Sequence, residues 1–256
     1  MNKECNRFKG RVAIVTAGAS GIGRATSKLL ASEGADVVII DANIEGANKV
    51  VDEIKALRCR ATTMKVDVTS YDEASEMVKA TLDKFGQIDI LANIVGGAIK
   101  EKIGPFAQSN KEDWRKTVDL NLFSTLNCTR AVVNHMMERR SGKIVNIASV
   151  GAVVGQKNTA DYAAAKGGII AFTKSLAKEV APYGINVNCV SPGPIATPRA
   201  LAFPEEMIQR QIKMVHLGRY GKPEEVAAMI AFLASDEASY ITGANFLVDG
   251  GISLSY

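Results

Sequence analysis

A tyrosine and a lysine stand four residues apart in the segment ADYAAAKGG, as Tyr162 and Lys166. Residues at this spacing share one face of a helix. A phenol exchanges protons poorly near neutral pH, because its free pKa is about 10. A nearby ammonium lowers that pKa, which would let Tyr162 exchange a proton with an alcohol or carbonyl oxygen. Ser149, at the end of GKIVNIAS, could hold the same substrate oxygen.

A glycine-rich stretch at residues 15–23, VTAGASGIG, lies between an apolar run and a stretch of helical period. Glycines at such a turn let the backbone approach a pyrophosphate, whose charge the N-terminus of a helix favours. The general G-x-G-x-x-G fingerprint is not met, because Gly21 and Gly23 are followed by Thr26 where the third glycine belongs. Alone, the stretch could equally be a turn that packs a helix on a strand.

Asp41 ends the next apolar run. It follows Gly23 at the sequence separation that is typical of a ribose-binding carboxylate. Such a carboxylate accepts hydrogen bonds from an adenosine ribose and would repel a 2′-phosphate. No lysine or arginine occurs in DANIEG, so the sequence favours NAD, while Arg24 leaves NADP as the less favoured alternative. Asp41 could also simply cap the following turn.

The elements that must position these residues form a regular alternation. Short continuous apolar runs, typical of strands covered on both faces, alternate with longer stretches of helical period. We therefore predict an α/β single-domain Rossmann fold over residues 1–256, a doubly wound seven-stranded parallel sheet with helices on both faces. Irregular segments at 95–109 and 191–221 follow strands, where such folds bind ligands. The predicted strands are RVAIVT, DVVIID, ATTMKVDV, IDILAN, GKIVNIAS, INVNCVSPG and NFLVDGG.

Composition narrows the function classes. The 256 residues are 47% hydrophobic, and the net charge of +4 comes without a lysine-arginine block, which argues against nucleic-acid binding. No signal-like or membrane-length apolar run occurs, so we expect a soluble, cytoplasmic protein without a membrane partner. We expect no metal site, because the cysteines form no C-x-x-C pair and the histidines lie far apart; these residues are Cys5, Cys59, Cys128, Cys189, His135 and His216.

Taken together, these residues resemble the short-chain dehydrogenase/reductase family, and its 3-oxoacyl-reductase-like branch in particular, over essentially the whole chain. The resemblance rests on ordered motifs. The family's T-G-x-x-x-G-x-G turn corresponds to residues 16–23, its N-N-A-G to residues 93–96, and its P-G-x-[IV]-x-T to residues 192–197. Its catalytic residues fall on Asn121, Ser149, Tyr162 and Lys166.

The resemblance implies a mechanism. Tyr162 would exchange the proton with the substrate oxygen, Lys166 would lower the pKa of Tyr162 and hold the nicotinamide ribose, and Ser149 would orient the substrate. Asn121 would position a proton-relaying water. The resemblance implies NAD contacts by the glycine turn, the adenosine side and the late P-G segment: Thr16, Gly18, Ser20, Gly21, Ile22, Gly23, Asp41, Asp67, Val68, Asn93, Gly96, Tyr162, Lys166, Pro192, Gly193, Ile195 and Thr197.

The sequence departs from the family pattern at two places. Ala17 replaces the first glycine of the turn, and we expect Gly18 to supply any unusual dihedral there. Ile94 and Val95 replace Asn-Ala, which removes an amide that can brace the central strand. Asn93 and Gly96, expected to face the cofactor and to allow the turn, remain.

These features predict an NAD-dependent oxidoreductase that interconverts a secondary alcohol and a ketone, on a cyclic or acyl hydroxy compound. The alternatives are an NADPH-dependent 3-oxoacyl thioester reductase and a catalytically silent NAD-binding regulatory protein. A lid at 193–221 would cover the small-molecule substrate, and Lys100, Lys102, Lys157 or Arg199 could meet an anionic group on it. The resemblance also implies a homotetramer formed through two long helices, 121–140 and 162–182, and the last strand.

Overall fold

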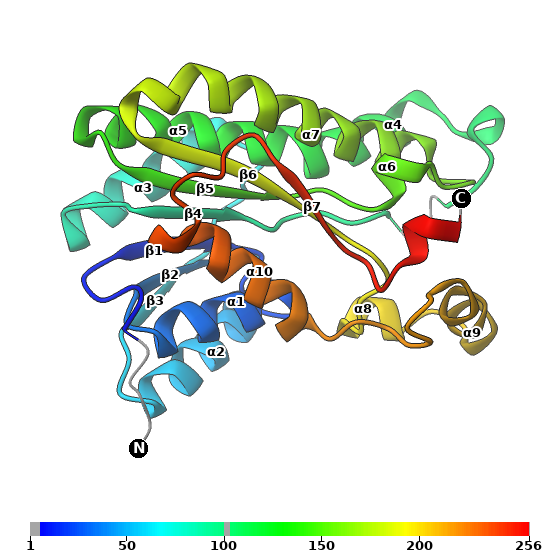
Figure 1. Ribbon diagram of the computed structural model, residues 1–256, viewed down its shortest axis with the longest axis horizontal. Helices are drawn as coiled ribbons and strands as arrows, with labels where there is room; N and C mark the ends of the chain where they lie inside the picture. The colour runs from blue at the N-terminus through cyan, green and yellow to red at the C-terminus, as the bar shows by residue number, and fades with distance from the viewer. Residues whose placement is uncertain (1–5, 100–102, 256) are drawn as a thin grey trace.

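The computed structural model describes residues 6–99 and 103–255. Their strands form one all-parallel sheet of seven in the order β3-β2-β1-β4-β5-β6-β7 (Figure 1). The chain starts at the centre of the sheet, runs outward to β3 and then crosses to β4, which confirms the predicted doubly wound topology. The strands are β1 (Val12–Thr16), β2 (Asp36–Ile40), β3 (Ala61–Met64), β4 (Ile90–Asn93), β5 (Gly142–Ile147), β6 (Ile185–Pro192) and β7 (Asn245–Val248).

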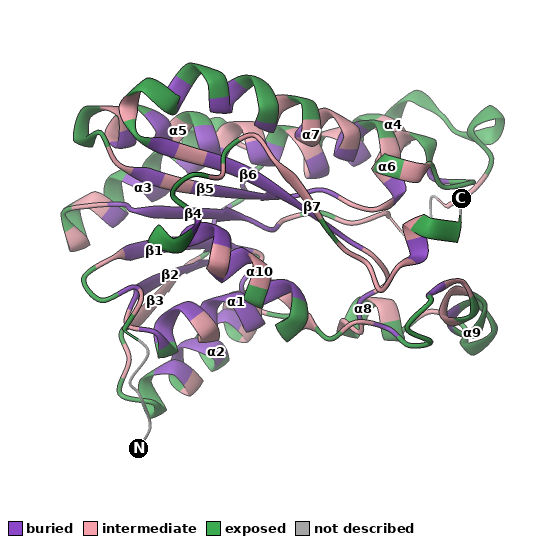
Figure 2. Cartoon of the chain, in the orientation of Figure 1, coloured by how far each residue is buried: buried purple, intermediate pink, exposed green. Residues whose placement is uncertain are grey.

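Helices cover both faces of the sheet (Figure 1). On one face lie α1 (Gly21–Ser32), α2 (Ile44–Ala56) and α10 (Pro223–Ala234); on the other lie α3 (Tyr71–Phe85), α5 (Ser124–Arg139) and α7 (Ala160–Val180). A separate hydrophobic cluster fills each interface, the first around Leu30 and Ile39, the second around Met77 and Val187. Strands β1, β2 and β4 are buried throughout (Figure 2), which explains their continuous apolar sequences.

The third strand is shorter than predicted. The apolar pattern suggested a strand through Val68, but β3 ends at Met64. Beyond it Asp67 closes a turn, because its Oδ1 accepts hydrogen bonds from the amide (2.9 Å) and the hydroxyl (2.7 Å) of Thr69. Val66 and Val68 are buried all the same. Burial of a loop therefore produced the apolar signal that resembled a strand.

The predicted long helix at 121–140 is one part of a longer, interrupted segment. It begins with α4 (Lys111–Val118), passes through a π-helical turn, η3 (Asp119–Phe123), and continues as α5. A π-turn shifts the backbone hydrogen bonds from i+4 to i+5 and inserts one residue, a device often found at functional sites. Asn121 lies inside this turn and is fully buried.

The loops that follow the strands gather at one end of the sheet (Figure 1). They carry the short helices α6 (Gly151–Val154) and α8 (Pro198–Leu201), together with α9 (Glu205–Met214). The chain ends beside them in a single 3-10 turn, η6 (Ile252–Ser255). The predicted lid segment, residues 193–221, contains two of these helices, and it lies at the carboxyl ends of the strands; α9 falls in the stretch FPEEMIQRQIKM, whose sequence predicts a short helix.

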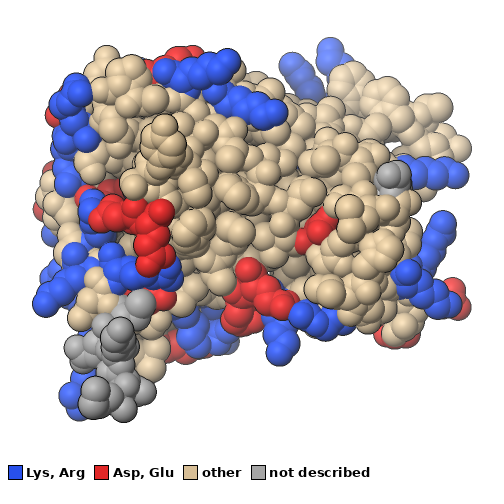
Figure 3. Space-filling model, in the orientation of Figure 1, with Lys and Arg blue, Asp and Glu red and all other residues tan. Residues whose placement is uncertain are grey.

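Some general properties bear on the site. Charged side chains of both signs lie in small, separate groups on the face shown in Figure 3. In the described ranges, no helix combines the length and the apolarity needed to cross a bilayer. Cys59, Cys128 and Cys189 are free thiols, and Cys5 lies outside the described residues. Within the same ranges, no group of three metal-ligating side chains comes together.

Candidate active site

The turn between β1 and α1 contains two left-handed residues, Ala17 with φ +53° and Gly21 with φ +50°. The expectation that Gly18 supplies the unusual dihedral is wrong, because its φ is not positive. Gly18 is instead needed for packing, since a Cβ there would lie 2.6 Å from Ile39 Cγ2. Ala17 itself adopts the strained conformation, which costs an L-residue about 1–2 kcal/mol.

The first turn of α1 is arranged to receive an anion. Ser20 precedes the helix in an extended conformation, is exposed and makes no capping hydrogen bond with its side chain. The first turn carries no acidic residue. A Cβ on Gly23 would lie 2.0 Å from Ala17 O, so the helix start packs directly on the turn. The positive end of the helix and its first amides fit a pyrophosphate, which Ser20, Gly21, Ile22 and Gly23 would hold.

Asp41 links the end of β2 to this turn. Its Oδ2 accepts a hydrogen bond from the Ala19 amide at 2.9 Å, and its Oδ1 accepts one from the Asn43 amide at 2.9 Å. The capping function considered from the sequence is therefore real. It also fixes a partly exposed carboxylate beside the glycine turn, where the ribose of a bound dinucleotide is expected.

Arg24, the cation that left NADP as an alternative cofactor, forms an ion pair with Glu53. Its Nη2 lies 2.6 Å from Glu53 Oε2, and Lys28 Nζ lies 2.8 Å from the same oxygen. The hydrogen bond from Lys28, followed by that from Arg24, lowers the pKa of Glu53. Glu53 therefore partly neutralises the cations on this side of α1.

Asp67 and Val68 follow β3, next to Asp41 in space, because Ile40 and Met64 are register partners at the ends of β2 and β3. Asp67 is exposed, while the Val68 carbonyl accepts a hydrogen bond from Asn127 Nδ2 at 3.2 Å. The predicted adenine-side residues thus form a fixed rim at the neighbouring strand end.

Thr16 was predicted to bind the cofactor, but its hydroxyl faces the protein interior. The side chain is buried, and its Oγ1 accepts hydrogen bonds from the amides of Ile94 at 2.8 Å and Val95 at 3.2 Å. These bonds hold the loop after β4 against the end of β1. Thr16 is thus a positioning residue for the loop that contains Gly96.

Asn93 is a second correction. Its Nδ2 donates to Thr129 Oγ1 at 3.0 Å and to Asn146 Oδ1 at 2.9 Å, inside the molecule, so its side chain does not face the cofactor as expected. Asn146 in turn donates to Thr173 Oγ1 at 2.9 Å. This buried chain of side chains joins α5, β4, β5 and α7. Asn93 therefore supplies the bracing amide that seemed lost with Ile94.

Lys166 and Asn121 converge below Gly96. Lys166 is buried, and its Nζ donates to the carbonyl of Ile147 at 2.9 Å. A Cβ on Gly96 would lie 2.7 Å from that Nζ and 2.4 Å from Asn121 Oδ1, so only glycine fits here. Burial lowers the pKa of Lys166 to about 8. The ammonium is therefore poorly solvated and well placed to bind an added oxygen.

The π-turn directs the Asn121 side chain into this cluster. Its Nδ2 donates to the carbonyls of Thr117 (2.9 Å) and Gly97 (3.2 Å), while its Oδ1 accepts from the Gly97 amide at 2.8 Å. Asn121 thereby fixes the loop after β4 as well as standing beside Lys166. Sequence periodicity predicts neither the contact of Asn121 with Gly97 nor its position beside Lys166, because both depend on the inserted π-turn.

Ser149 and Tyr162 form the second half of the site. Ser149 Oγ accepts a hydrogen bond from the Gly151 amide at 3.1 Å, and the same side chain lies close enough to Tyr162 to lower the pKa of its phenol. Burial raises the pKa of Tyr162, while Ser149 and the charge of Arg199 lower it. The sequence predicted that Lys166 lowers this pKa. In the structure the Lys166 ammonium is directed toward Ile147, and Arg199 is the cation that acts on Tyr162.

The P-G segment closes over the nucleotide turn. Gly193 donates its amide to Val248 O at 3.0 Å, which holds it against Asp249, and Ile195 is buried. Thr197 caps α8, and its Cγ2 would lie 2.9 Å from a Cβ on Gly21. The segment that begins at Pro192 thus brings the lid into contact with the glycine turn.

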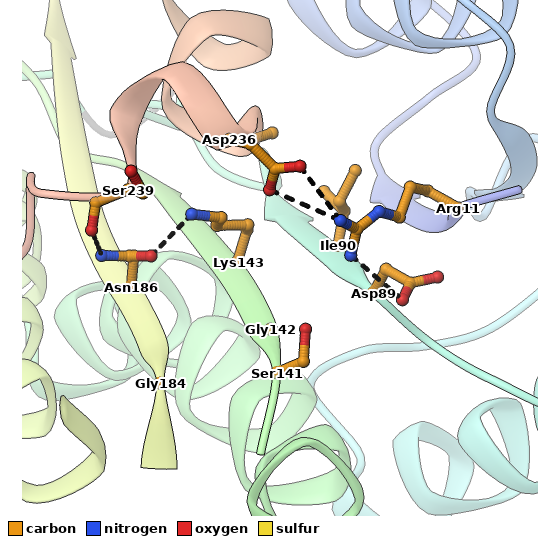
Figure 4. Close-up of a pocket in the computed structure, with 11 residues that line it drawn as sticks. Arg11, Asp89, Ile90, Ser141, Gly142, Lys143, Gly184, Asn186, Asp236 and Ser239 are labelled. Carbon is orange, nitrogen blue, oxygen red and sulfur yellow. Dashed lines mark hydrogen bonds and ion pairs between the residues drawn. The ribbon is translucent and has the colours of Figure 1, made fainter. Parts of the chain in front are cut away.

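A pocket of about 230 Å³ lies at the opposite end of the sheet, at the amino ends of β1, β4, β5 and β6 (Figure 4). Its cations already have partners. Arg11 lies 3.2 Å from Asp236 and 3.7 Å from Asp89, and Lys143 Nζ donates to Asn186 Oδ1 at 2.6 Å. This hollow is a charge-paired junction between loops, far along the strands from the residues described above.

The chain is similar to known proteins over nearly its whole length. A family model described as Enoyl-(Acyl carrier protein) reductase matches residues 16–253. The chain is 40% identical over 246 residues to the 3-oxoacyl-[acyl-carrier-protein] reductase FabG of Thermotoga maritima, which covers 96% of this chain and 99% of that protein. It is 39% identical over 244 residues to the cis-4-hydroxycyclohexanecarboxylate dehydrogenase of Sinomonas cyclohexanicum, covering 95% and 97%.

A solved structure shows the same architecture. The crystal structure of levodione reductase superposes with a TM-score of 0.92 at 35% identity, covering 97% of this chain and all of that one. The likeness in sequence and in fold extends over nearly the whole chain, and the family match spans residues 16–253.

Proposed function

The chain belongs to the short-chain dehydrogenase/reductase family and is an NAD(P)-dependent oxidoreductase of hydroxyl and keto groups; within that class, we propose that it uses NAD to interconvert a secondary alcohol and a ketone. The observation that carries the proposal is the pair of Ser149 and Tyr162, in which Ser149 lowers the pKa of the phenol, with the buried Lys166 one turn further along α7. This pair lies at the same end of the sheet as the N-terminus of α1.

The residues of the chain have distinct parts in the reaction. In the oxidising direction, Tyr162 Oη takes the hydroxyl proton of the alcohol, while Ser149 Oγ holds the same substrate oxygen. A bound nicotinamide would supply the chemistry that the side chains lack, namely acceptance of a hydride from the carbinol carbon. Lys166 Nζ would hold the nicotinamide ribose, Ser149 and Arg199 lower the pKa of the phenol, and Asn121 would hold a water that passes the proton to solvent.

The choice of NAD rests on the charges around the ribose position. Asp41 presents a fixed carboxylate there, which would lie against the 2′-phosphate of NADP. Arg24, the nearest cation on α1, is paired with Glu53. A 2′-phosphate would therefore meet a like charge without a free counter-charge from Arg24, which supports NAD.

The substrate we propose is a cyclic or acyl hydroxy compound. The lid side of the site carries exposed apolar side chains, among them Val153 on α6 and Leu201 on α8. These can cover a ring or an acyl chain. The names of two similar proteins, a hydroxycyclohexanecarboxylate dehydrogenase and a levodione reductase, refer to ring compounds and support the first of these.

The second candidate is a 3-oxoacyl-[acyl-carrier-protein] reductase working with NADPH, the reaction in the name of the Thermotoga maritima relative. Asp41 is the residue that argues against it. A catalytically silent nucleotide-binding protein is disfavoured because Asn121, Ser149, Tyr162 and Lys166 are all present.

The test is turnover with NAD and with NADP, using cyclic secondary alcohols and 3-hydroxyacyl thioesters. We expect NAD to be reduced with the ring alcohols. Tyr162→Phe should lose at least about 10³-fold in kcat, in line with removal of a general acid–base group, while still binding NAD in calorimetry. Tyr240→Phe is the matched control, because that phenol is fully exposed, and it should behave like the wild type.

Asp41→Ala tests the cofactor choice separately. Loss of the ribose hydrogen bonds should weaken NAD binding by about 1.5–3 kcal/mol, roughly 10–100-fold in Kd. It should also narrow the difference in affinity between NAD and NADP. Turnover by the wild type with NADP and acyl thioesters alone would replace the proposal with the second candidate.

A further inference from the structure

Arg199 is the one described cation of the lid whose charge reaches Tyr162. It occupies the first turn of α8, two residues after Thr197, which touches the glycine turn at Gly21. Its Nη2 donates to the carbonyl of Ala98, in the loop after β4. The guanidinium therefore links the lid to the loop after β4, the loop whose Gly96 and Gly97 contact Lys166 and Asn121.

Gly97 provides the place for this guanidinium. A Cβ at Gly97 would lie 2.8 Å from Arg199 Nη1 and 3.2 Å from its Cζ, and the φ of Gly97, +145°, also requires glycine. The Gly97 peptide is held on its other side by Asn121, through hydrogen bonds of 2.8 Å and 3.2 Å. Arg199 is thus packed on the same peptide that the catalytic asparagine fixes.

Arg199 is exposed, and it takes part in none of the ion pairs within residues 6–99 and 103–255. Of its five N–H donors, the described hydrogen bonds use one, to Ala98. A guanidinium presents its donors as a planar fork that matches a carboxylate bidentately. Neutral alcohols and ketones give such a group nothing to pair with.

We propose that Arg199 is a specificity-determining residue that binds a carboxylate on the substrate, so that the preferred substrates are hydroxy or keto acids in which the carboxylate and the reacting carbon are separated by a ring or a short chain. The inference rests on the proposed function, because it places the reacting carbon at Tyr162 and Ser149. A bound carboxylate would orient the ring and would complete the charge balance between the lid and the loop after β4.

The first test measures binding and needs no turnover. Calorimetry on the NAD-loaded protein compares cyclohexanecarboxylate with cyclohexanecarboxamide, which has the same shape and no charge. We expect the carboxylate to bind at least about tenfold more tightly than the amide, and Arg199→Gln to remove this difference. Arg199→Lys keeps the charge but not the fork, and it should retain only part of the preference.

Two further variants separate the possible causes. Lys49→Gln removes one positive charge from the exposed face of α2, and it should leave the carboxylate preference unchanged. Tyr162→Phe should keep the preference while losing turnover. NAD affinity should be the same, within about threefold, in Arg199→Gln and the wild type; a loss of NAD affinity matching the loss of carboxylate binding would assign Arg199 to the cofactor and overturn the proposal.

Turnover gives the second readout. With NADH as the reductant, the wild type should reduce 3- or 4-oxocyclohexanecarboxylate with a higher kcat/KM than the corresponding methyl ester, mainly through a lower KM. Arg199→Gln should make the acid no better a substrate than the ester. Equal binding of carboxylate and carboxamide, or a preference that survives in Arg199→Gln, would refute the inference and leave the proposed function intact. A protein that binds the carboxylate through Arg199 but reduces no ketone would support the inference while the proposed reaction fails.

Discussion

At the scale of single residues, the site depends on a few side chains whose surroundings change their chemistry. Lys166 is buried with a pKa lowered to about 8, and the pKa of Tyr162 is raised by burial and lowered by Ser149 and Arg199. Burial therefore opposes ionisation of the phenol. A bound cofactor and substrate must complete the charges that stabilise its ionised form.

Ser149→Ala tests this balance through pH dependence. Removing the hydroxyl removes a contribution that lowers the pKa of Tyr162, so that pKa should rise. Alcohol oxidation needs the ionised phenol as proton acceptor, so the rising limb of kcat/KM against pH should move to higher pH. Profiles for the wild type and the variant measure the shift; an unchanged limb, or one moved to lower pH, would show that Ser149 does not control the titration.

Ala17 is the residue at which this chain departs most clearly from its family pattern, and it adopts the left-handed conformation that glycine tolerates better. Ala17→Gly should remove about 1–2 kcal/mol of strain and lose about 0.5–1 kcal/mol to the more flexible unfolded chain. We therefore expect a net stabilisation of about 0.5–1 kcal/mol in urea unfolding.

Ala42→Gly is the control for that experiment, because Ala42 is exposed and has no positive φ. The control should be neutral or destabilised. Destabilisation of Ala17→Gly by as much as the control would mean that the turn is not strained.

At the scale of elements, the side-chain network through Asn93 and Asn146 positions α5, which follows the π-turn containing Asn121, and α7, which carries Tyr162 and Lys166. It joins Thr129 on α5 to Thr173 on α7 across β4 and β5. Asn146→Ala leaves buried polar groups without partners and should cost about 1–3 kcal/mol of unfolding free energy. It should also lower kcat, because Tyr162 and Lys166 are carried on α7.

The control for Asn146→Ala is Asn48→Ala on the exposed side of α2, for which the change should stay within about 0.5 kcal/mol. Chemical unfolding and steady-state rates measure both effects. A variant with wild-type stability would show that the network is dispensable.

The elements also show which parts could be predicted from the sequence. Apolar runs and helical periodicity gave the seven strands and the main helices, because parallel strands buried on both faces leave a strong local signal. The π-turn at Asn121, the interior roles of Thr16 and Asn93, and the contact of Arg199 with the catalytic cluster were not predictable in this way. Each depends on contacts between segments distant in the chain. The polar residues inside apolar strands, Asn93 and Asn146, were the only local signal of the network.

At the scale of the whole molecule, β7 is an edge strand with partly exposed apolar side chains, Leu247 among them. Such edges are usually covered. We propose that β7 and the outer faces of α5 and α7 pair between copies, forming a homotetramer. Sedimentation equilibrium at micromolar concentration should give four times the mass of the chain, and Leu247→Glu should reduce it. A monomeric wild type would contradict this assembly.

The central claim is that the molecule transfers hydride between a secondary alcohol and NAD. The most direct measurement supplies cyclohexanol or 4-hydroxycyclohexanecarboxylate deuterated at the carbinol carbon, together with NAD, and determines the mass of the reduced cofactor. The NADH formed should carry the deuterium, and Tyr162→Phe should form almost none. Tight NAD binding with no label transferred from any secondary alcohol would contradict the account.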